Sequence, residues 1–193
     1  QGIHLLNNGV ESKDIYFSSG IGSSYLAEMA KIRAFRTLWA GVLQAYGQKT
    51  ENPRLIGVNL AISYTKSDEY TNILRATSSA LSGILGGVEF MMIEPWNRTW
   101  EENVEFSSRI SRNVQNLLRD EGRLDKNLNA PNGSYFIDNL THQIAEKAWE
   151  EAREIQTLGD FLRFTESGEL NGRLSKSREE LVKSVSSGDQ TVL

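Results

Sequence analysis

The chain has 193 residues, of which 39% are hydrophobic, and this is typical of a globular domain with a sizeable core. A formal net charge of -4 and a pI near 5.3 argue against a broad basic surface for nucleic acid or an anionic membrane. The absence of cysteine excludes disulfides, thiolate metal sites and cysteine nucleophiles, and no apolar run approaches the ~18 residues that would span a bilayer. We therefore expect a cytoplasmic protein with no nucleic-acid or membrane partner.

Three times along the chain, a short strand precedes a loop and an amphipathic helix. Strands are predicted over residues 14–21, 55–64 and 88–94. The second strand alternates clearly, with bulky apolar side chains on one face and mostly small or polar ones on the other. Each strand leads into a helix with apolar residues at helical spacing, and glycine marks the end of each helix. The residues expected to face inward are Ile32, Phe35, Trp39, Val42 and Tyr46, then Ile73, Thr77, Leu81, Ile84 and Leu85, then Phe106, Ile110, Val114, Leu117 and Leu118.

The last third of the chain is predicted to be mainly helical. A helix beginning near Asp138 has one apolar stripe and an acidic opposite side. After Gly159 large apolar residues become few, and the chain ends in a stretch rich in Ser, Gly and Asp. We therefore divide the chain into residues 1–160, which form the main domain, and residues 161–193, which form a peripheral wrapping tail.

Repeated strand–helix units predict an α/β fold with a parallel sheet, either doubly wound or part of a (β/α)8 barrel. A complete barrel takes about 250 residues and eight units. Three units therefore predict a partial barrel, with its remaining strands on a segment outside this sequence. Exposed edges on the first and third strands are expected to pair with the rest of such a barrel.

The stretch "IYFSSGIGSSYL" leaves three interpretations open. Gly20 and Gly22 lie between strand and helix, as in a dinucleotide-binding turn, but Tyr25 stands where that turn needs its third glycine. A second interpretation is that small residues simply ease a tight turn. The third is that neighbouring strand residues line a barrel interior left open for a ligand. The candidate substrate-binding residues of that interior are Ser18, Ser19, Asn59 and Ser63.

Other candidate groups favour structural roles. His4 and His142 are more typical of solvated or capping residues than of catalytic ones, and no metal-ligand spacing occurs. Glu89 and Glu94, five apart on one strand, face opposite sides. The basic residues of the first long helix, Lys31, Arg33 and Arg36, are expected to form a solvated face, with contact to a CoA phosphate as an alternative.

The run "AKIRAFRTLWA", preceded by "FSSGIGSSYLAEM", resembles the corresponding strand and helix of the methylmalonyl-CoA mutase family. The resemblance continues through "YTNILRATSSALSGILGGVEFMMIEPWN", "FSSRISRNVQNLLRDEGRL" and "APNGSYFIDNLTHQIAEKAWEEAREIQTLG", in the family's order and spacing. It covers about Asp14 to Phe161 and is far more specific than any single motif.

The resemblance implies a (β/α)8 barrel through which the CoA pantetheine chain passes, capped by a separate cobalamin domain. This chain would be the C-terminal part of that barrel, about its last three βα units, followed by a C-terminal helix and a tail. Catalytic members carry a threonine-histidine-serine-glutamine run where this sequence has "LIGVNLAISY", and a histidine-threonine-asparagine run where it has "MIEPWNRTW". The family's cobalamin-binding aspartate-x-histidine-x-x-glycine run is absent from this sequence.

These departures resemble the small, non-catalytic subunit of the heterodimeric mutases. The expected function is that of an isomerase component that supports the adenosylcobalamin-dependent interconversion of methylmalonyl-CoA and succinyl-CoA by a catalytic large subunit. This chain alone is expected to be inactive, with no catalytic, cofactor-binding or metal-binding residue, and adenosylcobalamin is expected on the partner. Two alternatives remain: a catalytic mutase whose active residues lie in another segment, and a non-enzymatic module that binds a CoA thioester or a partner protein.

Overall fold

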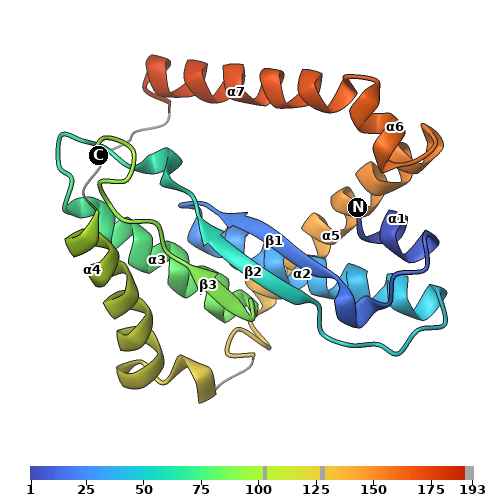
Figure 1. Cartoon of the computed structure of the whole chain (residues 1–193), viewed down its shortest axis with the longest axis horizontal. Coiled ribbons are helices and arrows are strands. Elements are labelled where there is room, and N and C mark those ends of the chain that lie inside the picture. The colour runs from blue at the N-terminus through green and yellow to red at the C-terminus, as the bar shows by residue number, and fades with distance from the viewer. Residues whose placement is uncertain (102–103, 127–128, 190–193) are drawn as a thin grey trace.

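A computed structural model describes residues 1–101, 104–126 and 129–189 of the chain. Three βα units form its centre (Figure 1). They are β1 (Tyr16–Ile21) with α2 (Tyr25–Ala45), β2 (Arg54–Asn59) with α3 (Thr71–Gly86), and β3 (Phe90–Met92) with α4 (Glu105–Asn116). The predicted α/β fold with three strand–helix units is confirmed.

Shorter elements and three further helices surround these units. They are α1 (Gly2–Asn7), the 3-10 turns η1 (Ser12–Asp14), η2 (Ala61–Ser63) and η4 (Leu124–Lys126), the π-helical turn η3 (Leu117–Glu121), and the helices α5 (Tyr135–Thr157), α6 (Phe161–Glu166) and α7 (Glu169–Ser187). Within the described residues, every helix is too short or too polar to cross a membrane.

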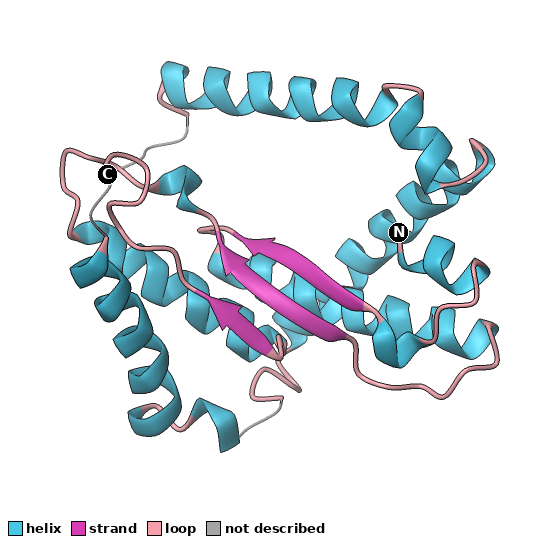
Figure 2. Ribbon diagram, in the orientation of Figure 1, coloured by secondary structure: helices cyan, strands magenta, loops and turns pink. Residues whose placement is uncertain are grey.

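The sheet is parallel, and its strands follow one another in the order β1-β2-β3. Helices α2 and α3 lie on the same face of this sheet, while its other face is free of both (Figure 2). A doubly wound sheet reverses its strand order and carries helices on both faces, whereas a (β/α)8 barrel keeps sequential order with all helices outside. The arrangement is therefore that of a barrel segment, and β1 and β3 each leave one edge unpaired.

The core lies between the sheet and the helices. Ile21, Ile32 and Leu55 form one fully buried cluster that joins β1, α2 and β2. Trp39 and Leu43 of α2 belong to a second cluster, which also holds α1 against this layer. Four of the five apolar residues predicted to face inward on α2 are buried or half-buried in this way, and Tyr46 is the exposed one.

The most deeply buried positions of α3 are small residues, and the large apolar residues that its sequence period suggests are half-buried beside them. The buried apolar and small positions are Ala76, Ser79, Ala80, Ser82, Gly83 and Gly86. Of the predicted inward residues Ile73, Thr77, Leu81, Ile84 and Leu85, all are half-buried, and Leu81 and Ile84 pack against a core cluster. Small side chains allow α3 to approach both α2 and the sheet closely. At Gly86 a Cβ atom would lie 2.9 Å from the Ile32 Cβ and 3.1 Å from the Met29 carbonyl oxygen.

Gly86→Ala is therefore expected to lower the free energy of unfolding by about 1–3 kcal/mol, because the added methyl pushes α3 away from α2. Gly41→Ala is the matched control: Gly41 is an exposed position inside α2, and a methyl group there would meet no atom within 4 Å apart from its chain neighbours and the backbone of its own helix, so alanine should stabilise the helix by about 0.5–1 kcal/mol. Urea unfolding of both variants measures the difference. Equal effects of the two substitutions would contradict the close α2–α3 contact.

All three predicted strands are longer than the observed ones. The first is predicted over residues 14–21, but β1 begins at Tyr16 and Asp14 belongs to the 3-10 turn η1. Alternation predicts the second strand over residues 55–64, but β2 ends at Asn59 and the chain turns through η2, closed by a hydrogen bond from the Tyr64 N–H to the Ala61 carbonyl oxygen (3.0 Å). The third strand is predicted over residues 88–94, but regular pairing covers only Phe90–Met92. The sequence alternates beyond the end of β2 because the residues of the following turn still lie alternately at more exposed and less exposed positions.

Helix α5 packs against α2, and α6 and α7 continue from its end. Arg33 of α2 donates to Asp138 of α5 (2.9 Å). Arg173 of α7 pairs with Glu154 of α5 (3.2 Å) and with Glu169 of α7 (3.2 Å), and it also contacts Glu151. Helix α6 begins at Phe161, and a domain boundary at this residue stays a prediction.

Candidate functional site at the carboxyl ends of the strands

The sheet face opposite α2 and α3 is the face that would line the interior of a closed barrel. Because side chains alternate along a strand, the strand register orders this face into rows. Tyr16 and Arg54 form the first row, Ser18, Ile56 and Phe90 the second, and Gly20, Val58 and Met92 the third, nearest the carboxyl ends. We call these eight residues the inner face. Active sites of (β/α)8 barrels lie at the carboxyl ends of the strands, so the third row and the loops beyond it form the candidate site.

The structure does not bring the four predicted site residues together. Ser18 is exposed on the inner face. Ser19, its neighbour in the strand, points to the helix side, and its hydroxyl donates to the Gly20 carbonyl oxygen at 3.4 Å. Asn59 also lies on the helix side and is only 1% exposed, while Ser63 follows the strand in η2. Substrate contact by these residues stays a prediction, and Ser18 alone lies where an axial ligand would pass.

Asn59 is instead the centre of a buried network that joins the ends of β2 and β3. Its Oδ1 accepts the Glu94 N–H at 2.6 Å, and its Nδ2 donates to the Tyr64 hydroxyl at 2.7 Å. The Tyr64 hydroxyl in turn donates to the Glu94 carbonyl oxygen at 3.5 Å, and Ser111 of α4 donates to the same carbonyl at 3.4 Å. The side-chain donor and acceptor of Asn59 are thus both satisfied within the protein.

The Tyr64 hydroxyl stays protonated in this network. Burial raises the pKa of Tyr64 above its ordinary value, and the hydrogen bond from Asn59 opposes this shift less strongly. A neutral hydroxyl is what the geometry requires, because it must accept from Asn59 and donate to Glu94 at once.

A second buried asparagine fixes the loops beyond the strands. Asn72 at the start of α3 is fully buried, and its Nδ2 donates to the Thr65 carbonyl oxygen (2.9 Å) and to the Trp96 carbonyl oxygen (3.3 Å). Its Oδ1 accepts the Thr65 N–H at 3.1 Å and a guanidinium N–H of Arg75 at 2.7 Å. Asn72 therefore ties the loop after β2 to the loop after β3.

A carboxylate–lysine pair at the end of β1 was not singled out in the sequence. Lys31 donates to the Gly20 carbonyl oxygen at 2.7 Å and pairs with Glu28, whose side chain is largely buried. The i,i+3 spacing of the pair on α2 is the signal that could have found it. Lys31, Arg33 and Arg36 do not form one solvated face, because Arg33 binds Asp138 on α5 and Arg36 donates to Asn52 at 3.0 Å.

Neither histidine reaches the carboxyl ends of the strands. His4 lies 3.5 Å from an Asp160 carboxylate oxygen at the start of α6, and His142 lies 3.2 Å from Glu146 on the same helix, α5. Among the described residues, no group of three or more His, Asp and Glu side chains is arranged to hold a metal ion.

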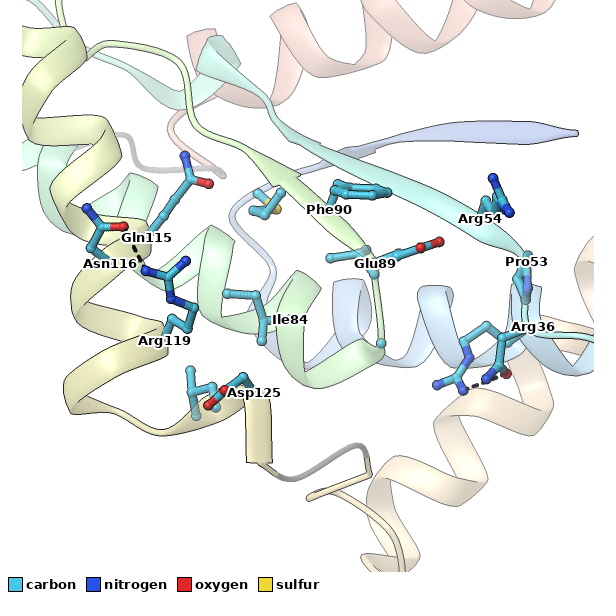
Figure 3. Close-up of a pocket in the computed structure, with 15 residues that line it drawn as sticks. Arg36, Pro53, Arg54, Ile84, Glu89, Phe90, Gln115, Asn116, Arg119 and Asp125 are labelled. Atoms are coloured by element: carbon cyan, nitrogen blue, oxygen red, sulfur yellow. Dashed lines mark hydrogen bonds between the residues drawn. The ribbon is translucent and has the colours of Figure 1, made fainter. Parts of the chain in front are cut away.

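A cavity of about 660 Å³ lies at the opposite, amino end of the strands (Figure 3). Its walls include Arg36, Arg54 and Arg119, with Phe90 and Glu89 beside them. The cavity borders β3, whose outer edge is unpaired among the described residues. A further barrel strand paired to β3 would occupy this place, so the cavity does not mark the site of chemistry.

Comparison with known proteins agrees with this architecture. The family model of methylmalonyl-CoA mutase matches residues 6–193, nearly the whole chain. This chain belongs to the methylmalonyl-CoA mutase family. The resemblance in the strand, helix and loop sequences is thereby confirmed.

Relatives of this mutase-family chain include both subunit types. It is 33% identical over 175 residues to the methylmalonyl-CoA mutase small subunit of Porphyromonas gingivalis, in a match that covers 89% of this chain and 28% of the relative. It is 30% identical to the methylmalonyl-CoA mutase of Rhizobium meliloti (79% of this chain, 22% of the relative) and 27% identical to the large subunit of P. gingivalis (92% and 25%). The chain thus spans about a quarter of the length of the curated relatives it matches.

Proposed function

We propose that this chain is the C-terminal part of the barrel in a small-subunit-like component of a methylmalonyl-CoA mutase. In this proposal residues 1–160 supply the last three βα units and residues 161–193 form a tail along the assembled subunit. The component would support the interconversion of methylmalonyl-CoA and succinyl-CoA, and a catalytic large subunit would carry out the reaction. The similarity to a small subunit at 33% identity supports this assignment.

The two open edges and the inner face support completion of a barrel by other strands. Tyr16 and Phe90 of the inner face are each 55% exposed, and Met92 is 49% exposed. Parallel sheets are almost always covered on both faces, because their crossovers place helices there or the sheet closes on itself. The partner for this face would be the remainder of the same subunit's barrel.

The chemistry of the inner face is the observation that carries the non-catalytic assignment. In the row nearest the carboxyl ends, Gly20, Val58 and Met92 offer no group that can transfer a proton or attack a substrate. Asn59, which directly follows Val58, points to the opposite face and is already satisfied.

In this proposal adenosylcobalamin is held by the catalytic partner, and no chemical step is routed through this chain. His4 and His142 lie on α1 and α5, away from the strand ends, and each lies beside a carboxylate.

Association with a large subunit tests the partnership. The complete subunit that contains these 193 residues, mixed with its catalytic large subunit, should sediment as a single complex larger than either component. The large subunit mixed with an unrelated (β/α)8 barrel protein of similar size is the control. Independent sedimentation of the two subunits at micromolar concentration would contradict the proposal.

A further inference from the structure

Leu60 lies directly over Gly20 on the inner face. A Cβ atom at Gly20 would come within 2.9 Å of both Leu60 Cδ atoms and within 3.0 Å of Leu60 Cγ. Gly20 lies between Ser19 and Ile21, which face the helices, so the position of its missing side chain belongs to the inner face. The Leu60 side chain therefore crosses from the end of β2 onto the end of β1.

The backbone holds Leu60 in this place from both sides. Its own N–H donates to the Ile21 carbonyl oxygen at 2.9 Å, which extends the β1–β2 ladder by one bond. The preceding residue, Asn59, is fixed to Glu94 and Tyr64. The turn through Ala61 follows at once, so Leu60 cannot move along the sheet without breaking these contacts.

With Leu60, the carboxyl end of the inner face becomes wholly apolar. Gly20, Val58 and Met92 form the third row, and Leu60 covers the glycine, which is the one gap in it. The polar residues of the inner face, Tyr16, Arg54 and Ser18, all lie in the two rows farther from this end. Barrel interiors without an axial ligand are filled by such layers of branched apolar side chains.

We propose that Leu60 is a plug that closes the carboxyl end of the barrel axis in this chain and excludes the acyl end of a CoA thioester from it. The proposal rests on the proposed function, because it requires a closed barrel. It assigns to one side chain the expected exclusion of a CoA thioester from this barrel. Gly20 is then glycine because Leu60 must lie flat against the sheet.

Calorimetry on the complete subunit, titrated with methylmalonyl-CoA, tests the plug. The wild-type subunit should show no binding, and Leu60→Ala should gain affinity by about tenfold or more, because the pocket opens by three carbon atoms. Leu74→Ala is the matched control, since Leu74 is 69% exposed on α3, outside the sheet, and should bind no better than wild type. Leu60→Val removes less volume and should show a smaller gain if Leu60→Ala does not fold.

Two results would overturn the plug. One is wild-type binding as tight as that of Leu60→Ala, and the other is the absence of binding in the wild type and in both Leu60 variants. Failure of the subunit to associate with a large subunit would overturn the proposed function instead, and the titration would still report on Leu60.

A double-mutant cycle tests the contact itself. Gly20→Ala alone should lower the urea midpoint, because its methyl collides with Leu60, and Gly20→Ala combined with Leu60→Ala should recover most of that loss. Additive effects of the two substitutions would show that Leu60 does not lie on Gly20 and would overturn the plug.

Discussion

Replacing Asn59 by leucine is expected to lower the free energy of unfolding by about 2–3 kcal/mol. Leucine has a similar volume but neither accepts the Glu94 N–H nor donates to the Tyr64 hydroxyl, so two polar groups lose their partner at a position that is 1% exposed. The ends of β2 and β3 thereby lose the side-chain link that passes through Asn59. Urea unfolding of wild type and variant measures the loss.

Two further variants make this measurement specific. Asn171→Leu changes an exposed asparagine of α7 and should leave the free energy of unfolding within about 0.5 kcal/mol of wild type. Tyr64→Phe removes only the hydroxyl that accepts from Asn59 and should cost about 1 kcal/mol. The two losses at Asn59 and Tyr64 should not add, because both residues belong to one network. Unchanged stability of Asn59→Leu together with altered thioester binding would instead identify Asn59 as a ligand contact.

Much of the fold follows from local sequence patterns. Alternation at Ile56 and Val58 predicts β2, and helical spacing of Ile32 and Trp39 predicts α2, because side-chain period depends on backbone geometry alone. The end of β2 could not be predicted in this way. It depends on the hydrogen bond between Asn59 and Glu94, 35 residues later in the chain. A contact between residues so far apart in sequence produces no periodic pattern from which it could be predicted.

The buried face of α3 could be predicted only in part, for a related reason. Hydrophobic period selects Ile73 and Leu81, which are half-buried, but the close approach of α3 to α2 and the sheet buries Ala80 and Gly86 more deeply. A helix packed on two neighbours buries its smallest residues where the approach is closest. The distances between α3 and its neighbours determine which residues of α3 are most deeply buried, and these distances cannot be derived from a single sequence.

The sequence suggests candidate residues for the site but does not give the direction in which each side chain points. Ser18 and Ser19 are adjacent in a strand, so they must face opposite sides, and only Ser18 lies on the inner face. Asn59 is predicted to contact a ligand as a strand residue that faces the barrel interior, but it lies on the helix side. Its partners there, Tyr64 and Glu94, come from the following loop and the next strand end, and contact with a ligand stays a prediction.

The second large effect concerns catalysis by the assembled protein. The complete subunit containing this chain, supplied with adenosylcobalamin, is expected to convert no methylmalonyl-CoA without a large subunit. The third row of its inner face has no side chain that can transfer a proton or attack a substrate, and neither histidine lies at the strand ends. With the large subunit present, turnover should appear, so the contrast spans the full catalytic acceleration, which for enzymes is about 10⁶-fold or more.

Adding increasing amounts of large subunit to a fixed amount of the complete subunit distinguishes turnover by the complex from a slow background conversion of methylmalonyl-CoA. Activity should rise in proportion to the large subunit and level off at a fixed ratio of the two subunits, as a stoichiometric complex requires. Gly41→Ala in this chain, an exposed and stabilising change, should leave both the slope and the ratio unchanged.

The decisive measurement for the non-catalytic assignment is turnover of methylmalonyl-CoA to succinyl-CoA by the complete subunit alone, compared with turnover by its mixture with the large subunit. We expect product only in the mixture. Product formed by the complete subunit alone, with adenosylcobalamin and at a rate proportional to its concentration, would contradict the assignment and would identify this chain as part of a catalytic mutase.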